Sequence, residues 1–414
     1  KSNLENIHHF LRNMFDTQII WQKNYVLDVF FFPSFIGALR EDDPIRLEVL
    51  NRYKISIKDF QLIVALLYLF RENSEVATDT AKVLGPDFFR AFNSIIEDLT
   101  IDWQKIAGKG LPQGKNHEDS FSKYLANIDL EETTFEGTES PWIEQYPIIA
   151  FNNQKIFSID SLLWQRRLST YFFEKLSTET ANFSDLFGKS FENYCKHIAT
   201  SNFPNGKIKS DLPKSTPNAD FIMEDDDNFY IVEIKHKKYD PKIFSIADAK
   251  RLSCQLFNQV VKGYKQVKAT AENIDNNRIF KYKRKPLNKR RIGFVVTERS
   301  YRIGHGTHFT SLAGLEHKIT DTHIKDDDIY FIGIQEFELL LLASRDSGIK
   351  LSDVVQASFS ERQVFIERRD LVKKFNLKTR TLAEFTKDEF LEGLRQRLAS
   401  NASESHQWIQ ESSV

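Results

Sequence analysis

The sequence feature that most constrains the fold is a pattern typical of a β-hairpin at residues 217–238, which read PNADFIMEDDDNFYIVEIKHKK. Residues 221–223 are apolar and end a first strand, and residues 224–228 form a polar turn that contains three consecutive aspartates. Residues 229–232 begin a second strand with a run of β-forming side chains. The stretch therefore predicts two short strands joined by an acidic turn.

Three charged side chains occupy positions in this hairpin where they can meet. Side chains at i and i+2 of a strand point to the same face of a sheet, so Glu233 and Lys235 are expected to project together. Ile234 then points the other way, into apolar surroundings. Asp220 lies at the start of the first strand, where the hairpin can bring it opposite Glu233. The spacing thus predicts a small site with two carboxylates and one ammonium group.

The charge balance of this site favours a bound cation. Two carboxylates held close together repel each other unless a cation lies between them. Oxygen ligands with room for water suit Mg²⁺ or Mn²⁺, so we expect Asp220 and Glu233 to bind one of these ions. A metal held in this way polarises a phosphoryl oxygen and lowers the pKa of a bound water. The ammonium group of Lys235 can hold that water or stabilise the negative charge that develops.

Asp220, Glu233 and Lys235 together resemble the signature of the PD-(D/E)xK nuclease superfamily, which has the restriction-endonuclease-like fold. The segment Pro-Asn-Ala-Asp that ends at Asp220 stands in place of the adjacent Pro-Asp pair of that signature, and the resemblance covers residues 184–343. It implies a nuclease that depends on Mg²⁺ or Mn²⁺, with the backbone carbonyl of Ile234 as a further metal ligand. The alternative is an exposed hairpin whose three charged side chains are only solvated.

The resemblance extends to two residues on flanking helices. Residues 184–202 predict a helix that carries Glu192, and a glutamate on this helix often approaches the metal in the superfamily. Glu192 is therefore a candidate metal ligand or supporting group, and a plain exposed glutamate is the alternative. Residues 245–274 predict one long helix on which Gln259 and Tyr264 approximate a glutamine and tyrosine that line the active site in several branches. Their spacing is one residue longer than in that motif.

A basic run at residues 278–291, RIFKYKRKPLNKRR, holds eight basic residues and no acidic one, with two aromatic side chains interleaved. Such a segment can neutralise phosphates, and an aromatic ring can stack on an unpaired base. The run follows the long helix directly, so we expect it to lie beside the metal site and to contact nucleic acid. The predicted contacts are Lys281, Lys283, Arg284, Lys285, Lys289 and Arg290. The alternative is a solvated basic loop before a strand.

The order of the remaining elements predicts an α+β or α/β protein, in which a mixed central sheet is flanked by helices. We expect a mostly helical domain for partner binding or assembly at residues 1–130, with helices over residues 57–71 and 88–103. The rest of the chain is expected to form a linking hairpin and helix (131–183), the nuclease-like domain (184–358) and a helical, partly disordered tail (359–414).

Composition narrows the range of partners and locations. The 57 lysines and arginines balance the 58 aspartates and glutamates, which argues against a general nucleic-acid coat protein and confines a nucleic-acid site to a local patch. The longest apolar run, residues 60–70, is too short to span a bilayer, so no membrane partner is expected. Two widely separated cysteines, Cys195 and Cys254, fit a reducing cytoplasm. Residues 1–130 are expected to bind a partner protein or another copy of the chain.

These features predict a divalent-metal-dependent nuclease that hydrolyses phosphodiester bonds, with DNA as the expected substrate. The combination of such a domain with an unrelated second domain is similar to restriction-like and anti-phage defence nucleases of the Mrr and Shedu type, a resemblance of architecture alone. It implies a bacterial cytoplasmic protein that acts on phage or plasmid DNA as an oligomer. The open alternatives are a catalytically inactive nucleic-acid-binding or assembly subunit with the same fold, an RNA-directed nuclease, and an unrelated helical protein without a central sheet.

Overall fold

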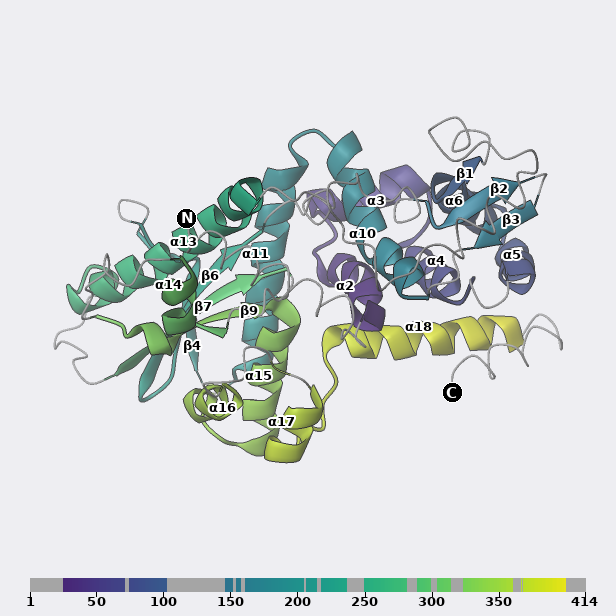
Figure 1. Ribbon diagram of the computed structural model, residues 1–414. Helices are drawn as coiled ribbons and strands as arrows, with labels where there is room; N and C mark the ends of the chain where they lie inside the picture. The colour runs from purple at the N-terminus through teal and green to yellow at the C-terminus, as the bar shows by residue number, and fades with distance from the viewer. Residues whose placement is uncertain are drawn as a thin grey trace, which may run out of the picture.

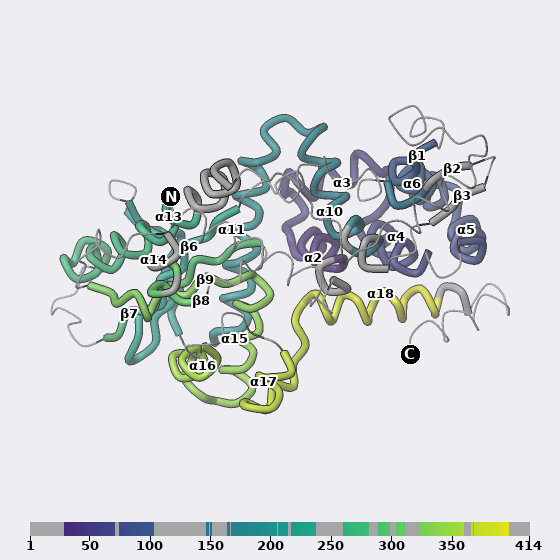
Figure 2. The backbone as a smooth tube through the Cα atoms, in the orientation of Figure 1, coloured from purple at the N-terminus to yellow at the C-terminus, as the bar shows by residue number. Residues whose placement is uncertain are grey.

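A computed structural model shows an α+β protein, in which N-terminal helices, a mixed six-stranded sheet and C-terminal helices follow one another (Figure 1, Figure 2). The mixed sheet confirms the predicted α+β class, and the alternative of a helical protein without a sheet is wrong. The restriction-endonuclease-like fold remains a prediction. The predicted domain boundaries remain predictions. The structure describes residues 25–70, 74–102, 146–151, 154–157, 161–204, 206–213, 217–236, 249–280, 289–298, 304–313, 323–359, 366 and 368–399.

The described N-terminal part is built from helices whose starts and apolar faces are visible in the sequence. They are α2 (Tyr25–Ala38), α3 (Pro44–Tyr53), α4 (Ile57–Phe70), α5 (Ser74–Val83) and α6 (Pro86–Asp98). The side chain of Asp43 caps α3 by accepting a hydrogen bond from the Ile45 N–H at 3.0 Å, and Pro44 occupies the first turn. α4 is apolar on most sides and correspondingly buried, which confirms the helix predicted over residues 57–71.

The helix predicted over residues 88–103 ends earlier than expected, because Thr100–Asp102 form strand β1. β1 pairs in parallel with β2 (Ile148–Phe151), which pairs antiparallel with β3 (Gln154–Phe157). The β-branched side chain of Thr100 suits a strand better than a helix interior. Pairing with β2 therefore decides the local structure here, against the helical pattern of the sequence.

The six-stranded sheet has the strand order β4-β5-β6-β7-β9-β8. Its strands are β4 (Lys207–Lys209), β5 (Phe221–Glu224), β6 (Asn228–Lys235), β7 (Arg290–Thr297), β8 (Gly304–His305) and β9 (Ile329–Gly333). β4, β5 and β6 are antiparallel, β6, β7 and β9 run parallel, and β8 is antiparallel to β9. The parallel pairs need crossovers, which are α13 (Ala249–Asp275) before β7, and α14 (Gly306–Ala313) with the short η1 (Asp326–Asp328) before β9. The predicted hairpin is the β5–β6 pair.

Alternating side chains of β6 serve the two buried faces of the sheet. Phe229 and Ile231 belong to the apolar cluster that α13 completes. Val232 belongs to the opposite cluster, which α11 (Phe183–Asn202) and α15 (Ile334–Ser347) complete. Figure 1 shows α13 on one side of the strands and α11 with α15 on the other. The charged end of β6 therefore lies between helices of both layers.

Helices α10 (Ser161–Glu179) and α11 connect the N-terminal helices with the sheet. The Phe187 ring of α11 lies with its centroid 5.1 Å from that of Phe35 on α2 and 4.3 Å from that of His236, which follows β6. One continuous buried cluster includes side chains of α2, α10, α11 and β6. The helical part and the sheet therefore share a hydrophobic core.

The C-terminal helices lead back to the N-terminal part. They are α16 (Leu351–Ser358), α17 (Arg368–Phe375) and α18 (Leu382–Ala399). α18 contacts α2 and α4 and adds Phe390 and Leu394 to their buried cluster, and Figure 1 shows it running beneath them. The last helix of the described chain thus belongs to the N-terminal core.

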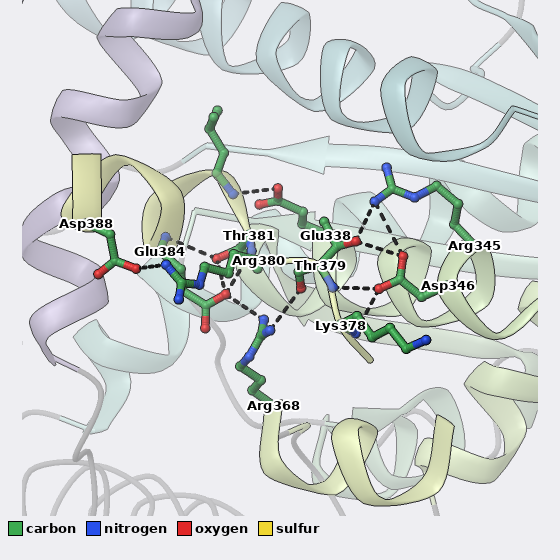
Figure 3. A network of polar contacts seen from close by, with 11 residues as sticks. Glu338, Arg345, Asp346, Arg368, Lys378, Thr379, Arg380, Thr381, Glu384 and Asp388 are labelled. Carbon is green, nitrogen blue, oxygen red and sulfur yellow. Dashed lines mark hydrogen bonds and ion pairs between the residues drawn. The ribbon is translucent and has the colours of Figure 1, made fainter. Parts of the chain in front are cut away.

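Carboxylates on α15 hold the segment that leads into α18, as Figure 3 shows. Glu338 accepts a hydrogen bond from the Leu382 N–H at 2.8 Å, and Asp346 accepts one from the Thr379 N–H at 2.6 Å. Burial raises the pKa of Glu338 to about 7, and the hydrogen bond from Leu382 opposes that shift. Polar capping as well as apolar contact therefore attaches α18 to the rest of the protein.

Candidate active site at the end of strand β6

Hydrogen bonds join Asp220 to the end of β6. Its N–H donates to the Val232 carbonyl at 3.1 Å, and its Oδ2 accepts from the Ile234 N–H at 2.7 Å. The β5–β6 register pairs Phe221 with Val232, and continuing it by one residue puts Asp220 across from Glu233. The structure thus brings together the two carboxylates that the spacing of the hairpin predicts to be opposite each other.

Glu233 is an almost completely buried carboxylate, with 1% of its surface exposed. Lys235 Nζ contacts its Oε1, while its Oε2 has no hydrogen-bond partner in the described part of the chain. Burial and the neighbouring Asp220 raise the pKa of Glu233 to about 8, and Lys235 opposes this shift. Burial also raises the pKa of Asp220, against the hydrogen bond from Ile234. Ionising both carboxylates therefore costs electrostatic free energy, and a bound cation would lower that cost.

The Lys235 side chain extends from the end of β6 beside α13 and is 12% exposed. A methyl group added to Gly263 of α13 would lie 3.3 Å from Lys235 Cγ and 2.9 Å from Val295 Cγ1. Glycine at this position lets the helix approach the strands closely, although it lowers helix propensity by about 1 kcal/mol relative to alanine. The helix backbone therefore limits the directions that the Lys235 side chain can take.

Glu192 on α11 is a third carboxylate in the electrostatic neighbourhood of the pair. Its charge contributes to the raised pKa of Asp220. Glu192 also forms an ion pair with Lys196 one turn along the helix, and its side chain is 32% exposed. Among the described residues, no group of three or more His, Cys, Asp or Glu side chains is arranged to hold a metal ion. Glu192 is thus near the carboxylate pair but does not complete a ligand cluster with it.

Gln259 and Lys262 both lie in the first half of α13. Gln259 is part of the helix, but its side chain lies outside the described residues. Lys262 is exposed, and its charge lowers the pKa of Glu233. The sequence motifs do not single out Lys262, although its place three residues after Gln259 puts both on one face of a helix.

His236 is another group at the end of β6 that the motifs do not identify. Its Nδ1 lies 3.2 Å from Oε2 of Glu298, which follows β7, and its ring contacts Phe187. The side chain is 4% exposed, and its Nε2 is buried without a hydrogen-bond partner among the residues that the structure describes. His236 therefore anchors the backbone just beyond Lys235. Its position directly after the motif lysine is the signal that could have drawn attention to it.

The C-terminal end of the basic run, residues 289–291, lies away from Lys235. Arg290 pairs with Asn228 at the start of β6, whereas Lys235 pairs with Thr297 at the end of β7. The eight residues from Arg290 to Thr297 are separated by seven steps of about 3.3 Å, so the two ends of β7 lie about 23 Å apart. α13 carries the chain back along the sheet before β7 begins, so the expectation that the run lies beside the metal site is wrong for this end of it.

Two of the predicted nucleic-acid contacts are described, and both pair with carboxylates of the protein. Lys289 Nζ lies 2.8 Å from Glu224 Oε1, and Arg290 Nε lies 3.2 Å from Asp328 Oδ1. These pairs hold the start of β7 against the acidic hairpin turn and η1. The other predicted contacts, Lys281, Lys283, Arg284 and Lys285, lie outside the described residues.

Comparisons with protein-family models, with curated proteins and with solved structures gave no match. In the described part of the chain, no helix combines the length and the hydropathy that crossing a membrane requires. A functional assignment therefore depends on the side chains at the end of β6.

Proposed function

We propose that the protein is a divalent-metal-dependent nuclease that hydrolyses phosphodiester bonds in DNA. The observation that carries this proposal is the carboxylate pair of half-buried Asp220 and fully buried Glu233, in which both pKa values are raised. One oxygen of Glu233 has no hydrogen-bond partner among the described residues, and Lys235 contacts the other. A buried charge in this situation needs a positive partner, and among the described residues Lys235 forms the one ion pair with these two carboxylates.

Mg²⁺ or Mn²⁺ suits the oxygen donors at this place. Asp220 and Glu233 would hold the ion, and the backbone carbonyl of Ile234 and the carboxylate of Glu192 are the further candidates. When bound, such an ion polarises a phosphoryl oxygen and makes water more acidic. The partnerless Oε2 of Glu233 fits a cation better than it fits a purely structural carboxylate.

The protein's own side chains supply the remaining chemistry in this proposal. Lys235 stabilises the negative charge that develops on the phosphoryl oxygens, or positions the attacking water. Because its side chain is only 12% exposed, its charge acts with little screening by solvent. Lys262 adds a second positive charge on the side of α13. Gln259 is a further supporting group in this proposal.

The choice of DNA follows from the resemblance to PD-(D/E)xK nucleases, and a role in anti-phage defence follows from the similarity to the Mrr and Shedu types. In this proposal the protein acts in the bacterial cytoplasm, as an oligomer or with a partner bound through residues 1–130. Lys281, Lys283, Arg284 and Lys285 of the basic run would contact the DNA backbone.

Cleavage of supercoiled plasmid tests the proposal directly. We expect the wild-type protein to nick or linearise plasmid with Mg²⁺ or Mn²⁺ and to be inactive in EDTA. Glu233→Ala should be inactive under all conditions, whereas Asp227→Ala, which removes an exposed carboxylate from the same hairpin, should match the wild type. Cleavage in EDTA, or equal cleavage by Glu233→Ala, would contradict the proposal. Cleavage of RNA alone in a parallel assay would keep the metal site and change the substrate.

Gly263→Ala is expected to slow plasmid cleavage about tenfold with little change in thermal stability. The gain in helix propensity, about 1 kcal/mol, offsets the crowding of Val295, so stability changes little. The added methyl group also displaces Lys235, and a displaced Lys235 slows the chemical step. Gly188→Ala on α11 is the matched control, since nothing lies within 4 Å of its added methyl group. Cleavage rates and thermal unfolding curves measure both effects, and a wild-type rate for Gly263→Ala would show that the close approach of α13 is unimportant for Lys235.

A further inference from the structure

The residue before Asp220 is held by helix α13. Thr270 Oγ1 accepts a hydrogen bond from the Ala219 N–H at 2.7 Å, and the same hydroxyl donates to the Gln266 carbonyl at 2.7 Å. Thr270 has no exposed surface, and Ala219 is 4% exposed. Because the hydroxyl proton is used within the helix, the oxygen lone pairs are available to Ala219. The backbone one residue before the carboxylate therefore has a buried, directional anchor.

Two further side chains of α13 bind the residues upstream. Gln266 Nε2 donates to the Asn218 carbonyl at 3.2 Å. Asn273 Nδ2 donates to Asn218 Oδ1 at 2.9 Å and to the Pro217 carbonyl at 3.3 Å. With Thr270, these residues follow an i, i+4, i+7 spacing, which places all of them on one face of the helix. α13 thus presents a polar ladder along the segment that leads into the site.

We infer that Thr270 and Asn273 are positioning residues that set the place of Asp220 in the cation site. The N–H and the carboxylate of Asp220 form hydrogen bonds with the backbone of β6. The segment directly before Asp220 is hydrogen-bonded to α13. The same helix approaches Lys235 at Gly263, so α13 helps to position both the Asp220 carboxylate and the Lys235 ammonium group. This inference rests on the proposed function, because it assigns the ladder to a cation site.

Thr270→Val tests the inference, since valine keeps the shape of threonine and removes the hydroxyl. The Ala219 N–H then loses its acceptor in a buried place, and the segment must shift to satisfy it. We expect Mn²⁺ to bind about tenfold more weakly or worse, as happens when groups that orient metal ligands are removed. The electron paramagnetic resonance signal of free Mn²⁺ measures this binding without any cleavage. Thr270→Ser restores the hydroxyl and is expected to bind Mn²⁺ as the wild type does.

Thr310→Val on α14 is the matched control, because Thr310 is 4% exposed and its hydroxyl donates to the Thr307 carbonyl at 3.0 Å, away from Asp220. We expect it to bind Mn²⁺ normally. Wild-type affinity in Thr270→Val would overturn the positioning role and leave the proposed function standing. A wild-type protein that binds no Mn²⁺ would overturn the proposed function and the positioning role with it.

Asn273→Ala provides a second test that leaves the Thr270 hydroxyl in place. It removes the hydrogen bonds to Asn218 and to the Pro217 carbonyl, so we expect weaker Mn²⁺ binding here as well. If Thr270→Val does not fold, Asn273→Ala tests the inference in its place. Unchanged Mn²⁺ binding by Asn273→Ala would then overturn the inference.

Discussion

Lys235→Ala is expected to lower the rate of phosphodiester cleavage about a thousandfold while leaving the fold and Mn²⁺ binding in place. Removal of a preorganised group that stabilises developing charge lowers rates by about 10² to 10³. The ammonium group of Lys235 is mostly shielded from solvent and contacts Glu233, so water cannot easily take its place. Mn²⁺ binding should persist, because loss of the ammonium group leaves the carboxylates with more need of a cation.

Single-turnover cleavage at saturating Mn²⁺ measures this effect apart from cation and DNA binding. Lys350→Ala is the matched control, since Lys350 is a surface lysine, 61% exposed, that pairs with Asp227 far along the hairpin turn. We expect this control to cleave at the wild-type rate. A Lys235→Ala rate within tenfold of the wild type would remove the lysine from the mechanism and favour a site in which the carboxylates act alone.

The hairpin that carries the site could be predicted because its signals are local. The alternation of β6 fixes which side chains share a face, so Glu233 and Lys235 could be paired from their spacing alone. Asp220 could be placed opposite Glu233 because an acidic turn of a few residues fixes the register of the two strands. The mixed sheet followed from the order of strands and helices, for the same local reasons.

The path of α13 could not be predicted in the same way. The helix has 27 residues and is about 40 Å long, so a small difference in its direction moves its far end a long way. It returns the chain to the start of β6, where Arg290 pairs with Asn228. The C-terminal end of the basic run, residues 289–291, therefore lies at the other end of the sheet from Lys235. Thr270 and Asn273 were equally hidden, since polar residues on a helix give no sign of which backbone they bind.

Glu233→Gln is expected to stabilise the protein at neutral pH in the absence of divalent cations. The folded-state pKa of Glu233 is about 8, above its ordinary value of 4.5, so the folded protein keeps a proton that the unfolded chain has released. The free energy of unfolding therefore falls as the pH rises from about 5 to about 8. At pH 7 this linkage amounts to about 3 kcal/mol, since each pKa unit corresponds to about 1.4 kcal/mol.

Glutamine removes the ionisation but also removes a partner of Lys235, so we expect a net gain of about 1 to 2 kcal/mol at pH 7. For a protein of this size the gain corresponds to a rise in Tm of a few degrees, about 2 to 4 °C for each kcal/mol. Thermal unfolding between pH 5 and pH 8.5 measures it. The wild type should lose stability across that window, and Glu233→Gln should lose less.

Divalent cations should reverse the order of the two proteins. Mg²⁺ or Mn²⁺ bound to the folded state adds about 2.7 kcal/mol at a hundred times the dissociation constant, and Glu233→Gln should forgo most of that gain. Glu338→Gln is the matched control, because Glu338 is also buried with a raised pKa, about 7, but lies on α15 and holds the Leu382 N–H. It should change the pH dependence without changing the response to cations. If divalent cations raise the Tm of wild type and Glu233→Gln equally, Glu233 is not a metal ligand. Its raised pKa would then reflect burial and the neighbouring Asp220 alone, and no cation site.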